Sequence, residues 1–63
     1  MITIVLAKPN DRCPRWQVFG VRMDTEDRYT FGVREFEATG REAAEGYAKE
    51  MMERYGADHF ERR

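Results

Sequence analysis

The chain has 63 residues, a formal net charge of −1 and one cysteine. This length excludes more than one domain, and the lone Cys13 excludes an internal disulfide and favours a reducing compartment. Aromatic residues make up 13% of the chain, which is too large a share for a disordered protein, so we expect one folded domain. A domain of about 60 residues buries only about 60% of its unfolded surface, so we expect marginal stability and either a monomer or a homodimer.

The first predicted element is a strand over residues 2–7, a run of apolar and β-branched residues that ends at Lys8 and Pro9. This run has no basic residues before it and is too short for a signal peptide or a membrane span. We therefore expect a cytoplasmic protein that does not contact membranes. A methionine followed directly by a strand is also typical of a complete small open reading frame.

Two further strands are predicted over residues 15–23 and 29–35, joined by a polar connection over residues 24–28. Alternation along the first of them divides its side chains between two faces. We expect Phe19, Val21 and Met23 to face the core, together with Tyr29, Phe31 and Val33 from the other strand. Trp16, Val18 and Arg22 then take the opposite face.

A helix is predicted over residues 40–55. Thr39 and Glu42 have the spacing of a capping box at its start, and Gly56 is placed to end it. Small and apolar residues recur at helical spacing, so we expect one core, formed by Phe19, Val21, Tyr29, Phe31, Val33, Ala44, Tyr47, Ala48 and Met51. The tail over residues 57–63 has only Phe60 as a large apolar residue and is expected to be partly mobile.

These elements predict a single α+β domain over residues 1–63. It consists of a three-stranded antiparallel β-sheet packed against one C-terminal α-helix, in the order βββα.

No set of residues predicts catalysis. Cys13 and His59 are far apart in sequence, and neither has a second histidine or cysteine at metal-ligand spacing. The carboxylates of the polar connection lack the oxygen-ligand spacing of a calcium loop. We therefore expect a protein that is not an enzyme, with no catalytic residue, no metal and no cofactor.

Charge is divided unevenly along the chain. Residues 1–22 carry four basic side chains against one acidic, whereas residues 24–53 carry nine carboxylates against four cations. A row of carboxylates can imitate a phosphate backbone and occupy a basic groove on another protein. The candidate partner-binding residues are Asp24, Glu26, Asp27, Glu42, Glu45 and Glu53. The alternative is a solvated helix surface, because Glu45–Lys49 and Glu50–Arg54 have the spacing of stabilising helix pairs.

A second candidate surface is the sheet face expected to point away from the helix. Trp16, Arg22 and Arg34 would gather there with Val18 and Thr30, and an aromatic ring with two arginines can bind nucleic acid. The alternative is that Trp16 and Val18 cover an open sheet face or pack against a second subunit.

Residues 36–48 follow a stretch of three aromatic-rich strands. Because of this combination, the chain resembles two families of βββα DNA-binding domains over residues 16–55. These families are the plant ethylene-response factors and the arm-binding domains of tyrosine recombinases. The resemblance implies a three-stranded sheet with one packed helix. It also implies that an exposed sheet face enters the major groove, for which Trp16, Arg22 and Arg34 occupy comparable positions.

In size and style the chain is also similar to small phage-encoded inhibitors of the anti-CRISPR type. This resemblance implies a protein that inhibits a nucleic-acid-binding complex of the bacterial host by occupancy, in the host cytoplasm. We place this interpretation first because it accounts for the acidic stretch, with which direct DNA binding conflicts. DNA binding through Trp16, Arg22 and Arg34 is the alternative.

Overall fold

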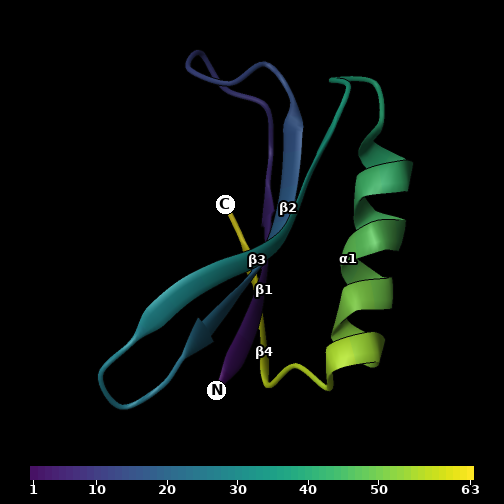
Figure 1. Ribbon diagram of the computed structural model, residues 1–63. Coiled ribbons are helices and arrows are strands. Elements are labelled where there is room, and N and C mark those ends of the chain that lie inside the picture. Colours follow the sequence, from purple (N-terminus) through teal and green to yellow (C-terminus); the bar gives the residue numbers. More distant parts are fainter.

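Figure 1 shows the computed structural model, which describes residues 1–63. The elements are β1 (Ile2–Ala7), β2 (Trp16–Met23), β3 (Arg28–Phe36), α1 (Arg41–Tyr55) and β4 (His59–Arg62). The strands form one sheet in the order β3-β2-β1-β4, and α1 packs against one of its faces. The structure therefore confirms the α+β class. No helix is long and apolar enough to cross a membrane.

The predicted sheet of three antiparallel strands with a C-terminal helix is wrong in detail. The tail that we expected to be partly mobile contains β4, which pairs in parallel with β1. The Asp58 amide donates to the Ile2 carbonyl at 2.8 Å, and the Arg63 amide donates to that of Leu6 at 2.9 Å. Backbone pairing with β1 holds β4 in the sheet. The sequence did not reveal this strand, because four residues with one large apolar side chain show too little alternation to be recognised.

The predicted hairpin of β2 and β3 is confirmed, with Trp16 opposite Phe36 and Met23 opposite Arg28. The pairing shifts near the middle of the hairpin, because Phe19 of β2 lies opposite both Gly32 and Val33 of β3. Gly32 has a φ of 62°, the left-handed conformation that glycine adopts in a bulge. The bulge reverses the alternation, so Val33 lies on the face away from α1 and is 61% exposed, not in the core as predicted.

The faces of β2 are the reverse of those predicted. Trp16 and Val18 pack with the helix-side core, and Phe19, Val21 and Met23 therefore lie on the other face. Both sets of side chains are apolar, so alternation alone does not decide which set meets the helix. Gly20 favours the observed arrangement, because the Phe31 ring packs on the helix side in the space that a Cβ at position 20 would fill.

The helix-side core consists of six buried residues, namely Ile4, Leu6, Val18, Ala44, Ala48 and Met51. The three helix positions among them are as predicted, and Phe31 and Tyr47 pack against the cluster in partly buried positions. Val21 is buried as well, but on the opposite face. The predicted core omitted β1, which supplies the two largest fully buried side chains.

The C-terminal cap of α1 was predicted correctly, and the N-terminal cap was not. The N-cap residue is Gly40 and no side chain bonds to the first turn, so the predicted capping box of Thr39 and Glu42 does not form. The helix begins with the Ala44 amide donating to the Gly40 carbonyl at 2.9 Å. Gly56 ends the helix in the left-handed conformation, as predicted, and its amide donates to the Met52 carbonyl.

Candidate functional site

The polar connection of the hairpin is a tight four-residue turn, Asp24–Asp27, which we call the acidic turn. The Asp24 amide donates to the Asp27 carbonyl at 2.8 Å, and the Thr25 amide donates to the Asp24 carboxylate at 3.0 Å. Backbone and local side-chain bonds thus hold the turn. Its three carboxylates, from Asp24, Glu26 and Asp27, are exposed, and none lies within 4 Å of a cationic group.

The three helix carboxylates of the candidate set have different surroundings. Glu42 and Glu53 are exposed and form no ion pair, whereas Glu45 is turned toward β4. The Arg62 guanidinium donates to the Glu45 carboxylate at 2.9 Å, and that of Arg41 lies 3.7 Å away. The hydrogen bond from Arg62 is the main cause that lowers the pKa of Glu45. The predicted helix pair Glu45–Lys49 does not form.

The structure divides the acidic candidates between two places. The acidic turn lies at the tip of the β2–β3 hairpin, which projects away from α1 (Figure 1). Glu42 is in the first turn of the helix and Glu53 in its last. The predicted Glu50–Arg54 pair is also absent. Glu45 is therefore the only candidate carboxylate with cationic partners, which are Arg41 and Arg62.

Trp16, Arg22 and Arg34 do not gather on the face away from the helix, so that prediction is wrong. The Trp16 indole donates to the Ala38 carbonyl at 3.0 Å and packs against the core. The Arg34 guanidinium lies 5.0 Å from the centre of the Phe36 ring. Arg22 lines a shallow helix-side hollow. The reversed faces of β2 and the bulge in β3 move all three residues to the helix side.

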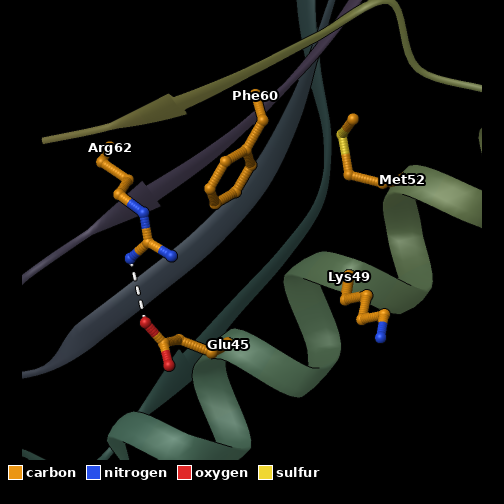
Figure 2. Close-up of a pocket in the computed structure, with 5 residues that line it drawn as sticks. All are labelled: Glu45, Lys49, Met52, Phe60 and Arg62. Carbon is orange, nitrogen blue, oxygen red and sulfur yellow. Dashed lines mark hydrogen bonds and ion pairs between the residues drawn. The ribbon is translucent and has the colours of Figure 1, made fainter.

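A groove that was not predicted lies between α1 and β4 (Figure 2). It has a volume of about 360 Å³ and is lined by Glu45, Lys49, Met52, Phe60 and Arg62. Figure 2 shows the Arg62–Glu45 ion pair at one end of the groove and the Phe60 ring facing its interior. Only the pairing of β4 with β1 brings these residues together, so the sequence pattern carried no signal for the groove.

The titratable side chains form no grouping with ligand or nucleophile geometry. No three residues of the His, Cys, Asp and Glu types lie together as a metal site would require. The Cys13 thiol lies 3.9 Å from the Glu35 carboxylate beside β3, whereas His59 belongs to β4 at the opposite edge of the sheet. Cys13 and His59 therefore form no pair.

Comparison with known proteins finds no family model that matches the chain, no similar curated protein and no similar solved structure.

Proposed function

We propose that this protein is a non-enzymatic binding protein that inhibits a nucleic-acid-handling complex by occupying its binding groove. The observation that carries the proposal is the acidic turn. Three of its four residues are carboxylates, they are exposed at a projecting hairpin tip, and no cation of the chain pairs with them. Carboxylates without cationic partners in their own chain are available to cations of another protein.

The physical basis is electrostatic complementarity. A groove that binds nucleic acid is lined by lysines and arginines, and a compact group of carboxylates can enter it in place of phosphates. Glu42 and Glu53 extend the negative surface along α1. Glu45 contributes least to this surface, because Arg41 and Arg62 already neutralise it.

The class of inhibitor proposed is the anti-CRISPR type, acting in the cytoplasm of a bacterial host, and the candidate partner is a nucleic-acid-binding effector complex. The support is the small size of the chain together with its unpaired carboxylates. Direct DNA binding through Trp16, Arg22 and Arg34 is an outcome of the test below. We place it second because the Trp16 indole donates to the Ala38 carbonyl and the Arg34 guanidinium lies over the Phe36 ring.

The test is a titration of the protein against a set of purified CRISPR effector complexes, with binding of their DNA targets as the readout. The proposal predicts that DNA binding by a susceptible complex falls to zero at a fixed molar ratio. It also predicts that the protein alone does not shift duplex DNA at low salt. A DNA shift by the protein alone, or no inhibition of any complex, would contradict the proposal.

A charge-reversal variant tests the acidic turn itself. The double change Glu26→Lys and Asp27→Lys should slow association with the complex roughly 10-fold or more at low salt, because such charges act mainly on the association rate. The matched control is Glu37→Lys with Glu50→Lys, which changes net charge equally at exposed positions outside the candidate set. Equal slowing by both variants would show a general charge effect and exclude a specific role of the turn.

A further inference from the structure

The two central strands carry apolar side chains on both faces, but the helix covers only one face. On the helix side lie Ile4, Leu6 and Val18. Figure 1 shows α1 on one side of the sheet and no element on the other. We call this uncovered surface the open sheet face, and its apolar residues are Met1, Val5, Phe19, Val21, Met23 and Val33. Strands with apolar residues on both faces are typical of sheets covered on both sides.

The open sheet face has an apolar centre and a charged rim. Val5 and Val21 are already buried by their neighbours at the centre, while Met1, Met23 and Val33 are 65%, 52% and 61% exposed. The rim consists of Arg28, Thr30 and Glu35 on β3 and of His59, Glu61 and Arg63 along the β4 edge. An apolar centre surrounded by polar residues is the usual anatomy of a protein interface.

We infer that the open sheet face binds a second copy of this chain, related by a two-fold axis parallel to the strands. The charges of the rim favour a second copy over an acidic or a basic partner. Within one copy Arg63 pairs with Glu61 and lies 5.6 Å from the centre of the Phe19 ring, whereas Arg28 and Glu35 form no ion pair. The two arginines balance the two glutamates, so these four side chains are neutral together and a copy of the face can supply charges of both signs.

The register of the sheet specifies how these charges meet. Glu35 pairs with Gln17, Gln17 with Ala7, and Arg63 follows Arg62, the partner of Leu6. Glu35 and Arg63 therefore lie at the same level on opposite edges of the sheet. A two-fold axis parallel to the strands stacks β3 over β4 of the other copy and β2 over its β1. Glu35 then faces Arg63 of the partner subunit, twice per dimer, and Phe19 lies over the partner's β1.

The size of the face sets the expected affinity. Four strands about 4.8 Å apart and about six residues long present a footprint of about 400 Å² per copy, which is below the roughly 800 Å² of a standard interface. A contact of this size gives a weak dimer, and we expect dissociation at tens to hundreds of micromolar (about 10⁻⁵–10⁻⁴ M).

Sedimentation equilibrium from about 10 µM to about 1 mM measures the association directly. The wild type should shift from monomer to dimer over this range. Val33→Asp should remain a monomer, because it places a carboxylate on the open sheet face without touching the helix-side core. The control Tyr29→Asp introduces the same group on the same strand at an exposed helix-side position and should still dimerise. A wild type that stays monomeric at the highest concentration, or a Val33→Asp variant that dimerises normally, would overturn the inference.

A charge swap tests the arrangement. Glu35→Arg and Arg63→Glu should each weaken the dimer several-fold at low salt, since each places like charges in opposition. Arg63→Glu also breaks the Arg63–Glu61 pair within one copy, so recovery of wild-type association by the double variant is the decisive result. Single variants with no effect would overturn the proposed axis. These measurements need no other protein, so their failure would be distinct from a failure of the inhibitor proposal.

Discussion

At the scale of the residue, Phe31 is a side chain of the sheet that also contacts the helix. Its ring lies over Gly20 and meets the Tyr55 ring edge-on at a centroid distance of 5.0 Å. We expect Phe31→Ala to lower the free energy of unfolding by about 2–4 kcal/mol, slightly less than for a fully buried phenylalanine because Phe31 is only partly buried. Urea denaturation measures this loss. Val33→Ala on the same strand is the control and should change stability by less than about 0.5 kcal/mol when measured well below the dimer concentration range.

Glu45 provides a second test at this scale, through its pKa. The hydrogen bond from Arg62 favours the charged carboxylate in the folded state, so the pKa of Glu45 lies below its ordinary value. Any stability that the pair contributes is therefore present above the unfolded-state pKa and lost as the pH falls through the lowered folded-state pKa. A carboxyl NMR titration of the Arg62→Gln variant should show the pKa of Glu45 rising toward that of an exposed glutamate. An unchanged pKa would contradict the role of Arg62.

At the scale of the element, two glycines of similar appearance in the sequence should respond oppositely to alanine. Gly46 lies within α1 with no atom near the position of a Cβ, so Gly46→Ala should raise stability by about 0.5–1 kcal/mol. Gly32 has a positive φ, and a Cβ there would lie 2.7 Å from the Met51 methyl carbon. Gly32→Ala should therefore cost about 1–3 kcal/mol. Thermal melts of the two variants compare them directly, and a neutral Gly32→Ala would contradict the assigned bulge.

The secondary-structure elements were easier to predict than the sheet faces on which their side chains lie. Polar connections and alternation located the ends of three strands and the helix to within one residue, which is inside the usual margin for element boundaries. The side of the sheet that meets the helix was not predictable, because Val18 and Phe19 are both suitable core residues. The extra residue at Gly32 then reversed the pattern of β3 from Val33 onward.

The candidate site was also predictable only in part. The acidic turn was predictable because three carboxylates in four residues between strands already indicate an exposed hairpin tip. The neutralisation of Glu45 was not, since Arg62 reaches it only through the parallel pairing of β4 with β1, a contact between residues far apart in the sequence.

At the scale of the whole molecule, the proposed dimer and the proposed function are geometrically compatible. A two-fold axis parallel to the strands keeps both hairpin tips at the same end of the dimer. Two acidic turns would then be displayed together, with six carboxylates in place of three. Such doubling would strengthen attraction to an extended basic groove beyond what one copy provides.

The contribution of β4 to the whole fold can be tested by ending the chain after Asp58. This truncation removes the edge strand that covers β1 and the arginine that binds Glu45, while it keeps the Asp58 carboxylate that accepts from the Ile2 amide at 2.9 Å. A domain of this size is stable by about 3–9 kcal/mol in total, so loss of a strand should abolish cooperative thermal unfolding. Phe60→Ala is the control, because it removes the largest side chain of β4 and leaves the backbone pairing, and it should still unfold cooperatively at a modestly lower temperature. Circular dichroism distinguishes the two, and a truncated chain that melts like the full one would show that the sheet is complete with three strands.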